Sequence, residues 1–363
     1  MARMLVVILM AMCSWSVSAQ VTAINLKEIN DEIKKRPEQY FYELKQSVNT
    51  ETSPIKKARL QVILSEMAYY IDQPEYILSY VDSAQNSGVL NDYWSARAMV
   101  SQARGYYQKR EGKLYLATAK VAYEKAKLVN DPLLETSAVI ELILANIEIG
   151  RKDAISQNMQ LAKKFISFLP DDFEKAVLLQ RYTKILTGLK KYDQAIKVIN
   201  DTLMIFQQEG SAHFTSVSYY HLGQAEAMRG DLRRALVAMQ LSLNWAIKDN
   251  NNLNQAFTLS RMAQLQTQLG LIDEAKQSLD MALKSASNTN SSIAQVLVLR
   301  HIAEFACQYQ VSECYKSYED AIAAASHHEM IAEVRDIRKE LAAVFAKDGK
   351  HKQAYETLLL SIQ

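Results

Sequence analysis

Histidines, cysteines and paired carboxylates are the residues of this chain whose chemistry could support catalysis or metal binding. The six histidines are scattered, and the sequence contains no HExxH, no paired CxxC and no GxxxxGK[ST] segment. His327 and His328 are adjacent, so on a helix their side chains would point about 100° apart and could not chelate one metal as residues four apart could. We therefore predict no metal site and no cofactor, and we expect these two histidines to be solvated.

One carboxylate pair, Asp171-Asp172, could serve acid–base chemistry. It follows Pro170 and precedes Glu174, and this order is typical of the start of a helix, where acidic residues are favoured near the positive end of the helix dipole. We interpret the pair as a helix start and predict no catalytic residue, so the chain is not expected to be an enzyme.

The amino terminus carries the pattern of an export signal. Arg3 precedes an uncharged apolar run, and the small residues Val17-Ser18-Ala19 stand before Gln20. The uncharged stretch is shorter than the roughly 20 residues that span a bilayer. The pattern predicts cleavage between Ala19 and Gln20 and a periplasmic or secreted mature chain. Cys13 would permit a lipoprotein, but Met12 is larger than the residue usual before an acylated cysteine.

After such cleavage two cysteines remain, Cys307 and Cys314. An oxidising compartment would allow them to form a disulfide, with one cysteine on each side of a tight turn between helices. The alternative is a pair of buried thiols, and the sequence leaves both open because the separation of the Cα atoms decides between them.

Composition favours a helical protein with a large core. About half of the 363 residues are apolar, while 10 glycines and 5 prolines are few for an all-β fold. The net charge is +2, which gives no indication of nucleic-acid binding.

A repeat of about 40 residues organises the chain. Ala195, Ala235 and Ala275 are each 40 residues apart, as are Gly230 and Gly270. Apolar residues on either side of each turn follow helical spacing, so each unit is predicted to be two amphipathic helices that bury their apolar faces only against neighbouring units. Five glycines are expected in left-handed conformation at the turn within a pair: Gly112, Gly150, Gly230, Gly270 and Gly349. The tripeptide Arg229-Gly230-Asp231, which matches an adhesion signal, is on this interpretation a turn followed by a helix start.

These residues resemble the tetratricopeptide repeat, which has Leu-Gly in its first helix, glycine at the turn and alanines in its second helix. Leu222, Gly223, Gly230 and Ala235 fit the pattern, and the period exceeds the family's roughly 34 residues, which implies longer helices. Departures are the missing tryptophan of the first helix, Lys190 at a turn-glycine position and Tyr315 at an alanine position. The resemblance implies an all-α solenoid of antiparallel helix pairs. We expect a signal peptide over 1–19, an atypical N-terminal helix pair acting as a cap over 20–53 and about eight pairs over 54–363.

In tetratricopeptide folds the first helix of each pair lines the concave surface, where peptides bind. By alignment, the corresponding positions here are polar and rich in amides, which suit hydrogen bonding to an extended peptide backbone: Gln180, Lys184, Tyr220, Gln224, Ser260, Gln264, Gln268, Arg300, Glu304 and Gln308. The alternative is an ordinary solvated face. Only Lys184 and Arg300 are cationic in this set and they lie three units apart, so a clamp for two carboxylates is not expected. The N-terminal third is rich in tyrosine, including Tyr69 and Tyr107, for which core packing is favoured over binding.

Two functions fit this pattern. The first is an exported, non-enzymatic scaffold that binds another polypeptide through its concave surface. The second is a sensory component of a membrane signalling system with a membrane signalling protein as partner, because the array resembles exported repeat regions of bacterial diguanylate cyclases and histidine kinases. The sequence ends directly after the last predicted unit, so such a component is expected to be stand-alone or truncated.

Overall fold

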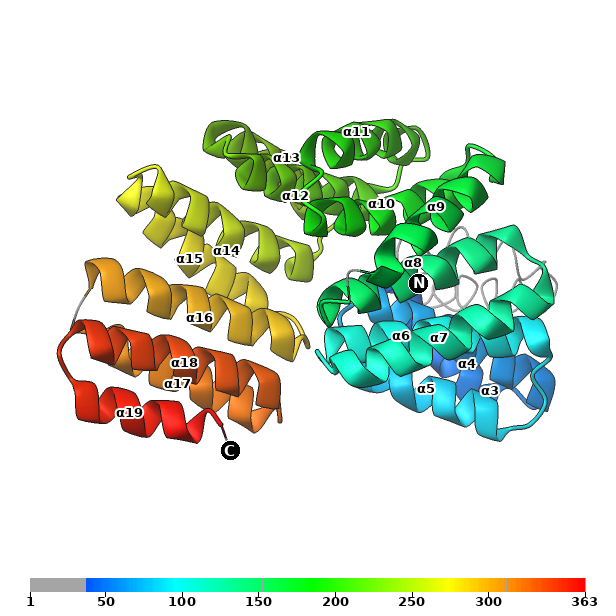
Figure 1. Ribbon diagram of the computed structural model, residues 1–363, viewed down its shortest axis with the longest axis horizontal. Coiled ribbons are helices and arrows are strands. Elements are labelled where there is room, and N and C mark those ends of the chain that lie inside the picture. The colour runs from blue at the N-terminus through cyan, green and yellow to red at the C-terminus, as the bar shows by residue number, and fades with distance from the viewer. Residues whose placement is uncertain (1–36, 152, 311, 363) are drawn as a thin grey trace, which may run out of the picture.

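The computed structural model describes residues 37–151, 153–310 and 312–362, and every regular element in these ranges is an α-helix (Figure 1). The predicted signal peptide and the first part of the predicted cap lie outside the described residues. The helices are α3 Pro37–Thr50, α4 Pro54–Tyr70, α5 Pro74–Asn86, α6 Asp92–Gln108, α7 Gly112–Val129, α8 Pro132–Glu148, α9 Asp153–Phe168, α10 Phe173–Gly188, α11 Tyr192–Gln208, α12 Ala212–Arg229, α13 Leu232–Lys248, α14 Asn252–Gln268, α15 Ile272–Ser287, α16 Ser292–Tyr309, α17 Cys314–His327, α18 Ile331–Lys347 and α19 His351–Leu360.

The sixteen helices from α4 to α19 form eight antiparallel pairs, each packed on the next, which confirms the predicted solenoid. The even-numbered helices are the first of each pair and lie on the inner side of the curve (Figure 1). They are covered on two sides, and α8 therefore buries eleven residues. The odd-numbered helices lie outside and bury one apolar stripe, so α9 buries only three residues.

Residues in left-handed conformation and aspartate caps form several of the turns that separate helices. Gly230 ends α12 with φ 103°, a conformation that side chains other than glycine rarely adopt, and the carboxylate of Asp231 accepts the backbone N–H of Arg234 to cap α13. The interpretation of Arg229-Gly230-Asp231 as a turn and a helix start is confirmed. Likewise Asp172 caps the start of α10, so the Asp171-Asp172 pair belongs to a helix start.

Two turns differ from the expected pattern. Lys190 stands where a glycine was expected and still adopts the left-handed conformation, with φ 59°. Gly112, by contrast, is the first residue of α7, and Arg110 takes the left-handed position, with φ 56°. The placement of Gly112 at the left-handed turn was wrong by two residues, because a side chain can occupy this conformation at a modest energetic cost.

Small residues allow the helices of a pair to approach closely. Ala235 and Ala275 are fully buried. A methyl group added to Gly223 would come within 2.8 Å of the Met239 Cε and 3.0 Å of the Ala235 carbonyl oxygen. The repeat alanines and Gly223 therefore lie where the space between the two helices leaves no room for a larger side chain.

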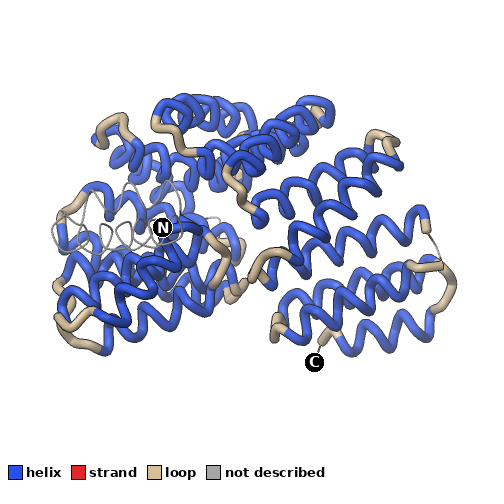
Figure 2. Tube along the Cα trace, turned by 180° about the vertical axis from the view of Figure 1, so that it is seen from behind, coloured by secondary structure: helices blue, strands red, loops and turns tan. Residues whose placement is uncertain are grey.

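The array curves round until its two ends meet (Figures 1 and 2). At one contact the α4–α5 loop touches the α15–α16 loop: the Gln73 Nε2 donates to the Asn290 carbonyl at 2.7 Å, and the Ser291 hydroxyl donates to the Asp72 carboxylate. These partners are more than two hundred residues apart in sequence.

A second contact between the two ends is ionic. The Arg110 guanidinium lies 2.7 Å from a carboxylate oxygen of Glu333 and 2.9 Å from one of Asp336, both on α18. We call these two sets of interactions the closure contacts. They turn an open solenoid into a ring around a central space.

Helix lengths and apolarity bear on membrane insertion. Within the described ranges, none of the helices combines the length and the apolar character needed to cross a bilayer.

Candidate functional site: the central cavity

A cavity of about 670 Å³ lies at the centre of the ring. Its walls come from the inner helices of all eight pairs, from α4 to α18, and three residues of the closure contacts, Asp72, Arg110 and Glu333, also line it. Every repeat thus contributes to one site, and the site depends on the ring being closed.

A buried charge network forms one wall. The Glu141 carboxylate of α8 is fully buried between two guanidiniums, with Arg104 Nε at 2.8 Å and Arg181 Nη2 at 2.7 Å, and it also accepts the Tyr115 hydroxyl at 2.8 Å. Burial alone would raise the pKa of Glu141, but the two guanidiniums lower it to about 2. Glu141 is therefore ionised at any physiological pH, and the network ties α6, α8 and α10 together.

Lys184 projects from α10 into the same cavity, beside this network. Its ammonium lies 5.5 Å from the centre of the Tyr107 ring, and the Arg181 guanidinium lies 4.6 Å from that ring on the same side of the site. Within the ranges that the structure describes, no carboxylate comes within ion-pair distance of Lys184. The nearby positive charge also acts on Tyr69: burial would raise the pKa of this phenol, but Arg181 and Lys184 lower it.

Asp72 is a carboxylate of the α4–α5 loop that also lines the cavity. It accepts hydrogen bonds from the Ser291 hydroxyl and from the Gln108 Nε2 at 3.0 Å. Burial raises the pKa of Asp72 to about 6, against the opposing effects of the Ser291 hydrogen bond and the Lys184 charge. The hydrogen-bond donors to the Asp72 carboxylate are therefore neutral, and burial makes its ionised form less favourable than it would be in water.

Two polar atoms in the cavity wall have no hydrogen-bond partner among the described residues. They are the Gln108 Oε1, an acceptor, and the Asn254 Nδ2, a donor, and both are fully buried. A buried polar group without a partner costs about 1–3 kcal/mol, so these two amides are held at a cost beside the cavity.

Two histidines line the cavity and differ from the exposed pair His327 and His328, whose predicted exposure is confirmed. Burial lowers the pKa of His213 to about 4, and burial together with the Lys184 charge lowers the pKa of His221 to about 3. Both are neutral at pH 7. Their burial was not foreseen from the sequence.

The predicted inner-face residues divide into three groups. Gln180, Lys184, Tyr220 and Gln224 line the central cavity. The Gln180 side chain is nevertheless mostly buried, and its Nε2 donates across to α12, to the Ser218 hydroxyl at 2.8 Å.

A second group lines a separate, smaller cavity of about 180 Å³: Gln264, Gln268, Glu304 and Gln308. Here the Gln264 Nε2 donates to the Glu304 carboxylate at 3.0 Å, a contact between residues exactly one repeat apart in register. The Gln308 Nε2 donates to the neighbouring Tyr309 hydroxyl at 2.9 Å.

The remaining two residues reach neither cavity. Ser260 is fully buried and hydrogen-bonds to the His301 imidazole, so its expected place on the open inner surface differs from its observed place between helices. Arg300 forms ion pairs with Glu340 and Glu304 and lies 3.6 Å from Glu333. Its charge is compensated within the solenoid.

Several cavity residues were missed by sequence alignment. Arg104 and Arg181 did not belong to the predicted set, and Tyr69 and Tyr107 were assigned to core packing but line the cavity. The available signal was the clustering of tyrosine in the N-terminal third, which spacing alone could not separate from packing.

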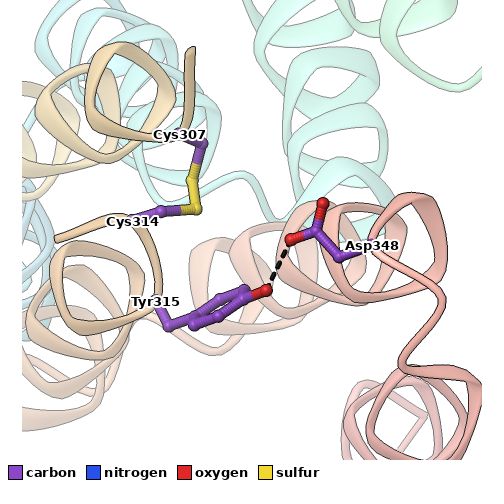
Figure 3. The surroundings of a disulfide bond; sticks show 4 residues. All are labelled: Cys307, Cys314, Tyr315 and Asp348. Carbon is purple, nitrogen blue, oxygen red and sulfur yellow. Dashed lines mark hydrogen bonds between the residues drawn. A yellow bond between two sulfur atoms is a disulfide. The ribbon is translucent and has the colours of Figure 1, made fainter. Parts of the chain in front are cut away.

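The two cysteines are joined by a disulfide between the end region of α16 and the first residue of α17, with Cα atoms 4.3 Å apart (Figure 3). Beside it, the Tyr315 hydroxyl donates to the Asp348 carboxylate at 2.5 Å, and Lys350 lies over the Tyr315 ring. Tyr315, which replaces a repeat alanine, thus links α17 to the α18–α19 turn.

Metal binding finds no support in the part of the chain that is described, where no group of three or more His, Cys, Asp or Glu side chains is arranged around a common point.

No family model matches the sequence, and no curated protein matches it. Solved structures do. A Rap protein complexed with competence and sporulation factor has a TM-score of 0.63 at 13% identity, covering 96% of this chain and 95% of that one. Aspartyl phosphate phosphatase F from Bacillus subtilis has a TM-score of 0.55 at 12% identity, covering 96% and 93%.

A third similar structure is a signal transduction ATPase with a tetratricopeptide repeat sensor from Pyrococcus horikoshii. Its TM-score is 0.58 at 14% identity, and the match covers 90% of this chain but 53% of that one. The chain has the fold of the tetratricopeptide-repeat proteins. At these identities the likeness concerns the fold.

Proposed function

We propose that this protein is an exported, non-enzymatic scaffold that binds a segment of another polypeptide in its central cavity. The observation that carries the proposal is the central cavity itself, which is built from the inner helices of every repeat and is lined by amide, tyrosine and cationic side chains. A site made by all repeats is a reason for the array to have its length and curvature.

The chemistry of the cavity suits a peptide backbone. The amide side chains of Gln108, Gln224 and Asn254 line the cavity, and an amide can both donate and accept hydrogen bonds, as the two polar groups of a peptide unit require. The rings of Tyr69, Tyr107 and Tyr220 supply flat amphipathic surface, which is common in binding sites.

The size of the cavity limits the ligand. A volume of about 670 Å³ falls within the roughly 300–1,000 Å³ typical of sites for small ligands, so it accommodates a short peptide segment and excludes a folded domain. The similar Rap protein is itself complexed with a factor, which is consistent with a ligand-binding use of this fold.

Export is supported by two separate features. The pattern of Arg3, the apolar run and Val17-Ser18-Ala19 is that of a signal peptide, and the Cys307–Cys314 disulfide fits an oxidising compartment. We infer a periplasmic or secreted mature protein beginning at Gln20. Cell fractionation followed by N-terminal sequencing of the tagged protein tests this; recovery of an uncleaved chain from the cytoplasm would contradict it.

Site-specific photo-crosslinking tests the binding function. A benzoyl-phenylalanine placed at Tyr220, inside the cavity, should capture short peptide segments that mass spectrometry can identify. The matched control replaces Phe168, an exposed aromatic residue on the outer helix α9. Capture of the same species at both positions would overturn the assignment of binding to the cavity.

A further inference from the structure

The positive charges of the cavity wall are unevenly compensated. Three cations, Arg104, Arg181 and Lys184, lie on neighbouring inner helices, and Glu141 is the carboxylate held between the two arginines. Asp72 faces them from the loop side but takes its hydrogen bonds from Ser291 and Gln108. The Lys184 ammonium lies over the Tyr107 ring and has no anion as its partner among the described residues.

From this geometry we infer that the cavity holds a carboxylate of its peptide ligand against the Lys184 ammonium, in a seat formed with the rings of Tyr69 and Tyr107. The inference rests on the proposed function and specifies its ligand: an acidic peptide group, either the free C-terminus or the side chain of Asp or Glu. A seat for one carboxylate is compatible with the sequence-based expectation that a clamp for two carboxylates is absent.

Desolvation makes this seat selective. A partly buried cation on a cavity wall loses part of its hydration, and a charge-assisted hydrogen bond to a ligand carboxylate compensates for that loss. The Arg104–Glu141–Arg181 network cannot move to compensate Lys184, since Glu141 already accepts from both guanidiniums and from the Tyr115 hydroxyl. The lowered pKa of Tyr69 reports the same positive potential at a group that burial would otherwise shift upward.

The arginine network also positions the seat. The Arg181 Nη1 donates to the Tyr69 hydroxyl at 2.7 Å, and the Arg181 guanidinium lies on the Tyr107 ring, so both rings beside Lys184 are fixed by the same residue. A ligand carboxylate therefore meets rings that are already held in place by contacts with Arg181.

The test uses the purified mature chain and four pools of random pentapeptides. The pools have a free or an amidated C-terminus, and each is made with or without Asp and Glu. Retained peptides are quantified by mass spectrometry after gel filtration. We expect the pool that lacks every carboxylate to be retained at least tenfold less than the others, and the two single-carboxylate pools to show whether the C-terminus or a side chain occupies the seat.

Variants assign the preference to Lys184. Lys184→Gln should reduce the excess retention of carboxylate-containing peptides at least tenfold, and Lys184→Arg should keep that excess. Lys276→Gln, on the exposed face of α15, should leave the excess unchanged. Equal retention of all four pools by the native chain would overturn the carboxylate seat while peptide binding stands, and this comparison holds even if Lys184→Gln does not fold. Retention of no peptide from any pool would overturn the proposed function and the seat together.

Discussion

The inner faces of the N-terminal region, residues 54–229, and the C-terminal region, residues 252–347, use the same register for different purposes. In both, polar side chains link one inner helix to the next at a spacing of about one repeat. In the N-terminal region the link is the buried triad of Arg104, Glu141 and Arg181, whereas in the C-terminal region it is the partly exposed pair of Gln264 and Glu304.

The two regions also differ in what their inner helices contribute to the cavities. The C-terminal region has the more regular repeats, and beside its small cavity Gln264 and Glu304 hydrogen-bond to each other. The less regular N-terminal region brings tyrosines and uncompensated positive charge to the central cavity. On the proposed function, the regular repeats serve mainly as scaffold, and the departures from the pattern carry the binding chemistry.

The largest expected effect comes from breaking the N-terminal link. Glu141→Gln would leave two buried guanidiniums without a counter-charge, and we expect a loss of about 3–5 kcal/mol in the free energy of unfolding. Urea denaturation measures it. The comparison variant is Glu304→Gln in the C-terminal region, where the partly exposed carboxylate should cost under about 1 kcal/mol. Equal losses would show that the two links are energetically alike.

Acid should destabilise the protein through its buried histidines. The pKa values of His213 and His221 are lowered by burial, so the unfolded chain binds more protons than the folded chain below about pH 6.5. Stability is therefore present above that pH and lost as pH falls towards 4, by about 2 kcal/mol for each histidine. Asp72, with its pKa raised to about 6, acts in the opposite direction.

Unfolding free energies at pH 7 and pH 4.5 check this expectation. The double variant His213→Gln with His221→Gln should lose less stability on acidification than the native chain, whereas His327→Gln, at an exposed position, should behave as the native chain does. An unchanged pH dependence in the double variant would show that the acid sensitivity comes from groups other than His213 and His221.

Residue size at one repeat position provides a more local comparison. Gly223 and Ala263 occupy equivalent sites in α12 and α14, 40 residues apart. Gly223→Ala would press a methyl group on Met239 and the Ala235 carbonyl, and should cost about 1–2 kcal/mol. Ala263→Gly should cost about 1 kcal/mol through helix propensity. Thermal denaturation of both variants measures whether each site requires the side-chain size that it has. A Gly223→Ala protein with a higher melting temperature would contradict the packing argument.

The sequence was sufficient for the solenoid and insufficient for the cavity. Periodic alanines and turn glycines predict helix pairs because each unit meets the same neighbours, so local spacing and global packing agree. Lys184 and Tyr220 were placed correctly on the inner side by that register. Ser260 was not, because a rotation of one residue position on a helix separates the open surface from the interface between helices.

The closure contacts could not be predicted at all. Asp72 and Ser291, or Arg110 and Glu333, meet only because small rotations between successive pairs add up around the ring, and no short-range pattern encodes that sum. The cavity inherits this limit, since its walls combine residues from both regions.

The smallest effect on stability, and the sharpest test of how the two regions meet, is expected from Arg110→Gln. Arg110 is partly exposed, and its ion pairs with Glu333 and Asp336 should contribute at most about 1 kcal/mol. Their geometric role is larger, because they join α18 to the α6–α7 turn. We expect a nearly unchanged melting temperature together with an increased radius of gyration in small-angle X-ray scattering.

Arg234→Gln is the control for this change, since it removes an exposed arginine paired only with Asp231 on its own helix turn and should leave the scattering curve unaltered. A contact that contributes little free energy can still set the curvature of a long, flexible array, because the other contacts act only between neighbouring helix pairs. If Arg110→Gln scatters as the native chain does, curvature is already fixed by packing between adjacent pairs, and the N-terminal and C-terminal regions meet as a consequence of the ring without helping to hold it.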